Sequence, residues 1–214
     1  LVEEDIVLTA SMTAESVTED MTKDEIYRIK REYRDQRIKE KELSSEYEWN
    51  LQAINLETSD IKEKQNVGKV KVAVLDSGVD WVSGINVIGD VNFVEEESNL
   101  PDMFQDMTGH GTGIAAIISG NGENGIYGVN PNAEVYSVKV LDKENKASLS
   151  RIVRSIYWCI ENDINIINMS FGTPVYSEVL EKAVKDAYDA NILMIAAAGN
   201  NGKEVEYPAA FDEV

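Results

Sequence analysis

The nine residues 70–78 read VKVAVLDSG, an apolar β-rich run that ends in an acid, a serine and a glycine. The four residues before Asp76 are uninterruptedly apolar, which is typical of a strand buried in a parallel sheet. Residues 164–169 read INIINM, a second β-rich run, and are followed by SFG. Residues 192–198 form a third, followed by GN, and its residues 192–196 are apolar on both faces, as a sheet covered on both sides requires.

Helical patterns separate these strands. An apolar helical run begins at His110, continues through Ile118 and is closed by Gly120. Further helices are expected at residues 149–161 and 177–191, and a further strand at 134–141. Alternating strands and helices predict parallel βαβ units with right-handed crossovers. The expected fold class is therefore α/β, a doubly wound parallel sheet with helices on both faces.

Ligands of such a sheet bind beyond the carboxyl ends of its strands. At these ends the sequence places Asp76, the segment Ser170-Phe171-Gly172, and Gly199-Asn200, with His110 at a helix start on the same side. We therefore expect the functional residues to converge on one edge of the sheet.

Charge and composition exclude several classes of protein. The formal net charge of −19 argues against binding of nucleic acid and against docking on anionic lipid. No apolar run reaches the roughly 18 residues that a membrane span needs. The single cysteine, Cys159, excludes an internal disulfide and lies in an apolar helical pattern, where it is expected as core filler.

His110, the only histidine, stands between two glycines and is the natural candidate for a general base near neutral pH. Asp76 could accept the other imidazole N–H and fix its tautomer. Asn200 could direct an uncharged amide at a developing oxyanion. Taken singly, each has a structural alternative: a histidine at a helix N-terminus, a turn or capping aspartate, a turn asparagine. Asp76 as a phosphoacceptor is disfavoured because the further acidic cluster is missing.

Taken together, the ordered segments VAVLDSG, GHGTG, NMSFG and AAGN resemble the subtilase family over residues 49–214. The resemblance implies that Asp76 and His110 are two members of a catalytic triad and that Asn200 is the oxyanion donor. It also implies that Ser170, Phe171 and Gly172 form a strand edge that pairs with an extended peptide substrate, and that Gly199 is a further substrate-binding residue. A peptide is thus the expected partner, and no cofactor is required.

Two departures from the family pattern stand out. Gly113 occupies a position where the family usually has a second histidine, and no GTSMA-type segment with the nucleophilic serine is present. We therefore expect residues 47–214 to be the N-terminal part of a catalytic domain, incomplete at its C-terminus and completed by a C-terminal remainder. Residues 1–46, with a charged helix expected from Lys23 to Leu43, would be a propeptide that packs on it.

Within the family, the chain resembles the lantibiotic leader peptidases, extracellular enzymes that remove the leader from a bacteriocin precursor. The alternatives are a general degradative extracellular subtilase and a catalytically dead relative that only binds peptides. A nucleotide-binding α/β domain is disfavoured because no GxGxxG follows the first strand.

Self-processing predicts a junction that resembles a substrate, and we expect it between Glu46 and Tyr47, within the segment LSSEYE. In the family, the loop after the oxyanion asparagine lines the specificity pocket; here Asn201 and Lys203 would then select an acidic residue before the scissile bond. The alternative is that Lys203 is a solvated loop lysine. A structural Ca²⁺ is possible after the His110 helix, but residues 121–125 offer a single carboxylate, so no metal site is predicted.

Overall fold

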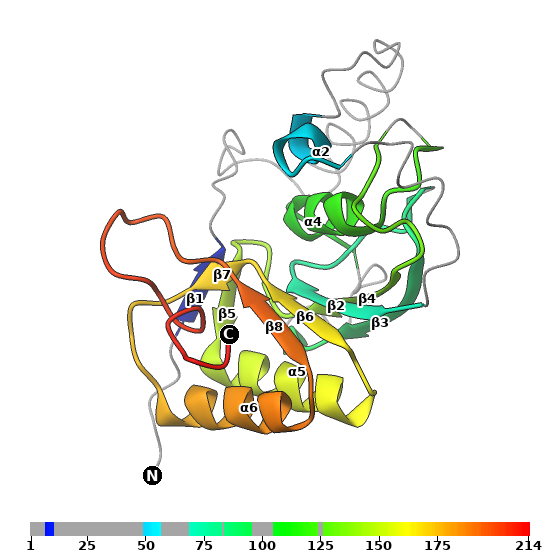
Figure 1. Ribbon diagram of the computed structural model, residues 1–214. Coiled ribbons are helices and arrows are strands. Elements are labelled where there is room, and N and C mark those ends of the chain that lie inside the picture. Colours follow the sequence, from blue (N-terminus) through cyan, green and yellow to red (C-terminus); the bar gives the residue numbers. More distant parts are fainter. Residues whose placement is uncertain (1–6, 11–48, 57–68, 83, 96–104, 124–125) are drawn as a thin grey trace, which may run out of the picture.

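The computed structural model describes residues 7–10, 49–56, 69–82, 84–95, 105–123 and 126–214 (Figure 1). Its largest element is a five-stranded sheet in the order β3-β4-β2-β6-β8, and every neighbouring pair in it is parallel. The strands are β2 (Lys71–Asp76), β3 (Val87–Asn92), β4 (Glu134–Lys139), β6 (Ile166–Met169) and β8 (Leu193–Ala196). The predicted parallel α/β sheet is confirmed.

Helices cover both faces of this sheet (Figure 1). On one face α5 (Leu149–Glu161) and α6 (Glu178–Asp189) enclose the main core, in which Ile152, Ile167 and Leu180 are completely buried. On the other face α4 (His110–Ser119) packs on β2 and β4 over a smaller apolar cluster around Val74 and Ala115. The short α2 (Trp49–Ala53) lies beyond α4. None of the helices described is long and apolar enough to cross a membrane.

The edge strand β8 differs from the expectation of burial on both faces. Leu193 and Ile195 are 58% and 51% exposed within the described part of the chain, while Met194 on the opposite face is buried. The reason is position, since α4 packs on β2 and β4, which lie two and three strands away from β8. Cys159 is fully buried in the main core, as predicted.

A second sheet has three antiparallel strands in the order β5-β1-β7. Its central strand is β1 (Val7–Ala10), which lies between β5 (Lys146–Ser148) and β7 (Phe171–Gly172). Of these three short strands, β7 lies in the edge that the family resemblance implied at residues 170–172, whereas β1 and β5 were not expected. The expected charged helix at residues 23–43 lies outside the described residues, so its prediction stands untested.

Candidate active site

The site is built on the carboxyl end of β2, the middle strand of the parallel sheet. Asp76, its last residue, is completely buried. The backbone carbonyl of Asp76 accepts hydrogen bonds from the N–H groups of Val140 and Leu141, at 2.8 and 3.1 Å. The end of β4 therefore fixes the position at which β2 presents its carboxylate.

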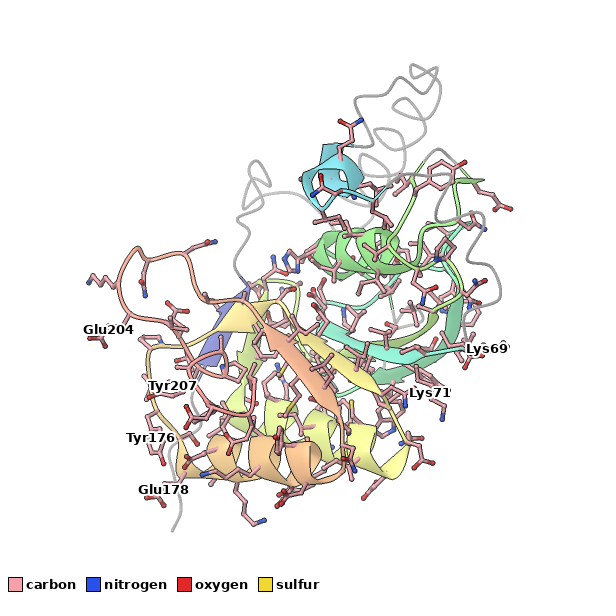
Figure 2. The ribbon with its side chains drawn as sticks, viewed as in Figure 1. Lys69, Lys71, Tyr176, Glu178, Glu204 and Tyr207 are labelled. Carbon is pink, nitrogen blue, oxygen red and sulfur yellow. The ribbon has the colours of Figure 1, made fainter. Side chains whose placement is uncertain are left out.

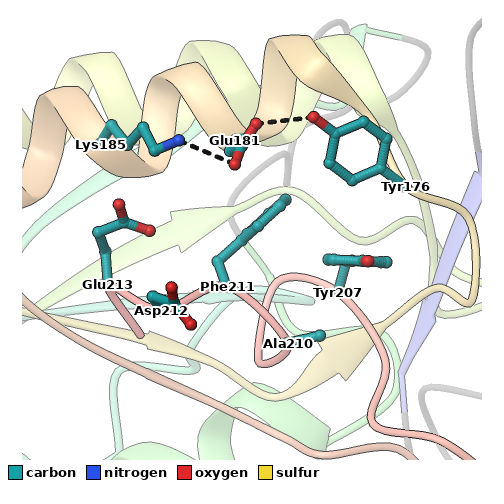
Figure 3. A pocket seen from close by; sticks show the side chains of 8 residues that line it. All are labelled: Tyr176, Glu181, Lys185, Tyr207, Ala210, Phe211, Asp212 and Glu213. Atoms are coloured by element: carbon teal, nitrogen blue, oxygen red, sulfur yellow. Dashed lines mark hydrogen bonds and ion pairs between the residues drawn. The ribbon is translucent and has the colours of Figure 1, made fainter.

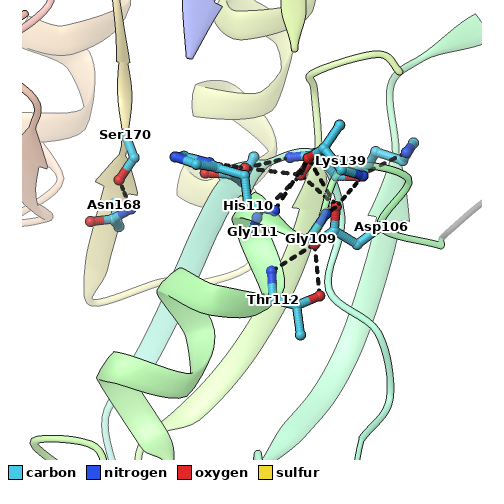
Figure 4. A network of polar contacts seen from close by, with 11 residues as sticks. Asp106, Gly109, His110, Gly111, Thr112, Lys139, Asn168 and Ser170 are labelled. Carbon is cyan, nitrogen blue, oxygen red and sulfur yellow. Dashed lines mark hydrogen bonds and ion pairs between the residues drawn. The ribbon is translucent and has the colours of Figure 1, made fainter. Parts of the chain in front are cut away.

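His110, the first residue of α4, meets this carboxylate directly (Figure 4). Its Nδ1 lies 2.7 Å from Oδ1 of Asp76, and its side chain is 6% exposed. Because an ionised carboxylate can only accept, Nδ1 carries the hydrogen and Nε2 keeps a free lone pair. The hydrogen bond to Asp76 raises the pKa of His110 above its ordinary value, although burial by itself would lower it. Two of the predicted site residues are thus brought together in the geometry that a general base requires.

A second acid, Asp106, organises the turn that carries His110 (Figure 4). Its Oδ2 accepts hydrogen bonds from the Thr112 N–H (2.8 Å) and hydroxyl (2.7 Å), and its Oδ1 accepts from the Gly109 N–H (2.8 Å). Asp106 therefore caps the N-terminus of α4, where a negative charge is favourable. Its charge also contributes, as the smallest of the causes, to the raised pKa of His110.

Ser77 connects the two acids. Its N–H donates to Asp76 Oδ1 at 2.7 Å, and its hydroxyl donates to Asp106 Oδ1 at 2.7 Å. Behind it, the fully buried Lys139 donates from Nζ to the carbonyl oxygens of Ser77 and Gln105, at 2.7 and 2.9 Å. Asp106 and Lys139 are residues that sequence reasoning missed. The position of Asp106, four residues before the histidine that opens the helix, could have indicated a role in the site. Nothing in the sequence around Lys139 distinguishes it from an ordinary strand residue.

The close approach of α4 to β2 requires glycine at position 111. A Cβ added there would lie 2.2 Å from the carbonyl oxygen of Gly78 and 3.0 Å from the Cβ of Asp76. Gly113, on the same helix, has no heavy atom of a described residue within 4 Å of an added Cβ. The family's second histidine position is therefore open space here.

The predicted peptide edge follows β6 directly. Asn168 donates from Nδ2 to the Ser170 hydroxyl at 2.9 Å, and in Figure 4 the imidazole of His110 points to the side on which Ser170 lies. Phe171 and Gly172 form β7, which pairs antiparallel with β1 in the register Ala10↔Phe171 and Thr9↔Gly172. An extended segment of this chain thus lies against the edge that was assigned to substrate.

The loop after β8 carries Asn200 on the same edge of the sheet. Asn200 is exposed, as are Asn201 and Lys203. The Lys203 N–H donates to Asn201 Oδ1 at 2.8 Å, and Asn201 Nδ2 donates to Glu206 Oε1 at 2.6 Å. The roles assigned to these three residues stay predictions, and Glu206 is a further residue that the sequence did not single out.

Two further sequence expectations fall wholly or partly outside the described residues. Glu46 and Tyr47, the predicted processing site, lie outside, as do the last two residues of the loop considered for calcium. Within the described part of the chain, no group of three or more histidine, cysteine, aspartate or glutamate side chains could hold a metal ion. The question of calcium stays open.

Comparison with known proteins gives the same assignment as the geometry. The model of the subtilase family matches residues 68–214. The chain belongs to the subtilase family. It is 37% identical over 172 residues to the minor extracellular protease Epr of Bacillus subtilis (strain 168), covering 77% of this chain and 26% of that protein.

Two further proteases are similar in sequence to this subtilase. A thermostable alkaline protease of Halalkalibacterium halodurans is 35% identical over 200 residues, 91% of this chain and 54% of the relative. An intracellular serine protease of Paenibacillus polymyxa is 39% identical over 155 residues, 68% of this chain and 48% of the relative. The chain thus spans from about a quarter to just over half of the lengths of these relatives.

A pair of glycine substitutions in this subtilase tests the contact between α4 and β2. Gly111→Ala should lower the free energy of unfolding of the full-length protein by about 1–3 kcal/mol, because a methyl group must displace the Gly78 backbone. Gly113→Ala in the same helix should raise it, by up to about 1 kcal/mol, because alanine favours the helix and meets no neighbour. Chemical denaturation measures both. Equal effects of the two substitutions would show that the close approach does not exist.

The titration of His110 tests the electrostatics of the site. We expect an NMR-measured pKa above 6.5, with the resonance assigned by its loss in His110→Ala. Asp76→Asn should lower that pKa more than Asp106→Asn, because only Asp76 contacts the ring. Since the folded-state pKa is raised, the pair stabilises the fold below pH 6.5, and this stabilisation is lost as pH rises through the folded-state pKa. A pKa at or below 6.5 would contradict the buried ion pair.

Proposed function

We propose that the full-length protein is a serine endopeptidase that cleaves peptide bonds by acyl transfer. The observation that carries this proposal is the 2.7 Å contact between Nδ1 of His110 and the buried carboxylate of Asp76. A serine outside residues 1–214 attacks the carbonyl carbon, and His110 takes its proton and returns it to the leaving amine. Asp76 orients the imidazole and stabilises its charged form. Asn200 and the serine's own backbone N–H hold the oxyanion.

The second sheet supports the binding of an extended peptide. A strand lies between β5 and β7 and pairs antiparallel with both, in the register Leu8↔Ala147 on one side and Thr9↔Gly172 on the other. In pairing of this kind the hydrogen bonds are formed by the main chain, so they depend little on which side chains the peptide carries. The occupant is the chain's own N-terminal segment, which supports the expectation that the propeptide is a partner of the catalytic domain.

The finer assignment is that the enzyme is extracellular and removes the leader from a lantibiotic precursor. The support is the resemblance in sequence, together with the relative Epr, whose name marks it as extracellular. A degradative protease and a catalytically dead peptide-binding module are the alternatives, and the relative named as intracellular keeps location a matter for experiment. The residue at the serine position beyond Val214 separates enzyme from binding module. Cleavage of a matched precursor at its leader junction alone separates leader peptidase from degradative protease.

Asn200 provides a test of the mechanism. In the full-length enzyme, Asn200→Ala should lower kcat by about 10²–10³ with little change in KM, because the amide contributes only once the oxyanion forms. Residues 1–214 alone should hydrolyse no peptide, since the nucleophile is supplied from outside them. A change confined to KM would assign Asn200 to ground-state binding, and turnover by residues 1–214 that depends on His110 would contradict the mechanism.

The N-terminus of the processed protein tests self-cleavage. A cut between Glu46 and Tyr47 predicts a mature chain that begins at Tyr47, and intact-mass spectrometry of the secreted or purified full-length protein would show it. His110→Ala should abolish the cut, because the same active site performs it. A mature chain that begins one or two residues after Ala10 would instead identify β1, the strand bound beside the active site, as the segment whose end is cut.

A further inference from the structure

The carboxylate of Glu206 lies between the predicted peptide edge, residues 170–172, and the loop after β8 that carries Asn200. We call residues 197–206 the oxyanion loop. A Cβ added to Gly172, in β7, would lie 2.7 Å from Oε2 of Glu206, and one added to Gly199 would lie 2.8 Å from its Cδ. The side chain of Glu206 therefore lies across two glycines, and any other residue at either position would displace it. Both glycines were assigned to substrate binding from the sequence.

The backbone around Glu206 is held on both sides. Its N–H donates to the carbonyl of Ala198, just beyond β8, at 3.1 Å. The next residue, Tyr207, exchanges two hydrogen bonds with Thr173, just beyond β7, at 2.8 and 2.9 Å. The backbone at Glu206 is thus held between the ends of β7 and β8.

An aromatic cluster anchors the segment that follows Glu206. The rings of Tyr207 and Phe211 lie 4.7 Å apart, and the ring of Tyr176 lies 5.7 Å from Tyr207 (Figures 2 and 3). The Tyr176 hydroxyl donates to Glu181 of α6 at 2.7 Å, and this bond raises the pKa of Tyr176 to about 12. These residues line a pocket against α6. Tyr207 therefore packs toward α6, while its neighbour Glu206 faces Gly172 and Gly199.

The charge of Glu206 is only partly compensated by the protein. Its Oε1 accepts a hydrogen bond from Asn201 Nδ2 at 2.6 Å. Among the residues that the structure describes, Glu206 forms no ion pair, and it is neither fully buried nor fully exposed. A carboxylate that is partly removed from water in this way favours the approach of a cation.

The register of β1 relates this carboxylate to the substrate. Thr9 pairs with Gly172 and Ala10 with Phe171, so a peptide bound in the same way continues toward Ser170 and the oxyanion loop. Asn200 would polarise the carbonyl of the residue just before the scissile bond. That residue would then lie beside Gly199 and the side chain of Glu206. We propose that Glu206 selects an arginine or lysine side chain immediately before the scissile bond. This specificity rests on the proposed peptidase function.

The inference competes with selection of an acidic residue by Lys203 and with the cut after Glu46, which places an acidic residue before the scissile bond. Lys203 is exposed, and the amide of Asn201 that was expected to assist it is bound to the carboxylate of Glu206. The two hypotheses predict opposite preferences, so one set of substrates separates them.

The test uses the full-length protein and three fluorogenic peptides that differ only in the residue before the cleaved bond: arginine, glutamine or glutamate. The wild type should favour arginine over glutamine by about tenfold or more in kcat/KM, because a charge-assisted hydrogen bond replaces a neutral one. Glu206→Gln should abolish most of that ratio. Glu204→Gln is the matched control. It removes the same charge from the same loop, at a side chain that is exposed (Figure 2).

A second measurement needs no variant. The arginine-to-glutamine ratio of the wild type should fall as salt is raised, because screening weakens the attraction between the two charges. An unchanged ratio in folded Glu206→Gln, a ratio that salt does not alter, or a wild-type preference for glutamate would each overturn the inference while leaving the peptidase intact. Failure of the full-length protein to cleave all three peptides would reject the proposed function itself, and this specificity with it.

Discussion

The hydrogen bond between the buried carboxylate of Asp76 and the imidazole of His110 is the contact on which the rest of the site depends. It joins the end of the central strand to the first residue of a helix that packs across the sheet. A carboxylate without a partner in this position would carry a large desolvation cost. The surrounding structure therefore has to bring α4 close, and it does so through Gly111, the capping acid Asp106 and the linking hydroxyl of Ser77.

This arrangement divides the chain's acids into two kinds. Among the acids whose burial the structure describes, Asp76 and Asp106 are buried, whereas the others are partly or fully exposed. Both accept hydrogen bonds, Asp106 from backbone N–H groups and hydroxyls and Asp76, through Oδ1, from the Ser77 N–H and the imidazole. Glu206 is intermediate, with one amide partner and a position between the peptide edge and the oxyanion loop. The first two acids contact or support His110, and the third lies against the two glycines of the predicted substrate-binding edge.

The sequence predicted the parts of the fold that long apolar periodicity encodes. The predicted helix at residues 149–161 matches α5, and the strand ending in Asp76 matches β2 within one residue. Strand β3 and the short strand β5 were missed because three to six residues of mixed polarity carry little periodic signal, and β7 was expected only from the family resemblance. Asp76 and His110 could be paired in advance because their strand-end and helix-start positions converge. Asp106, Lys139 and Glu206 could not, since their partners are backbone groups and glycines brought together only by tertiary packing.

The most direct test of the account is chemical labelling of the nucleophile in the full-length protein. A fluorophosphonate reagent, which modifies serines activated by a neighbouring base, would be followed by peptide mass mapping. The account predicts that a single serine beyond Val214 is labelled, and that His110→Ala or Asp76→Asn slows its labelling by several orders of magnitude. No labelled serine, or labelling at an equal rate in the wild type and in His110→Ala, would contradict the assignment of this pair as the catalytic base and its orienting acid.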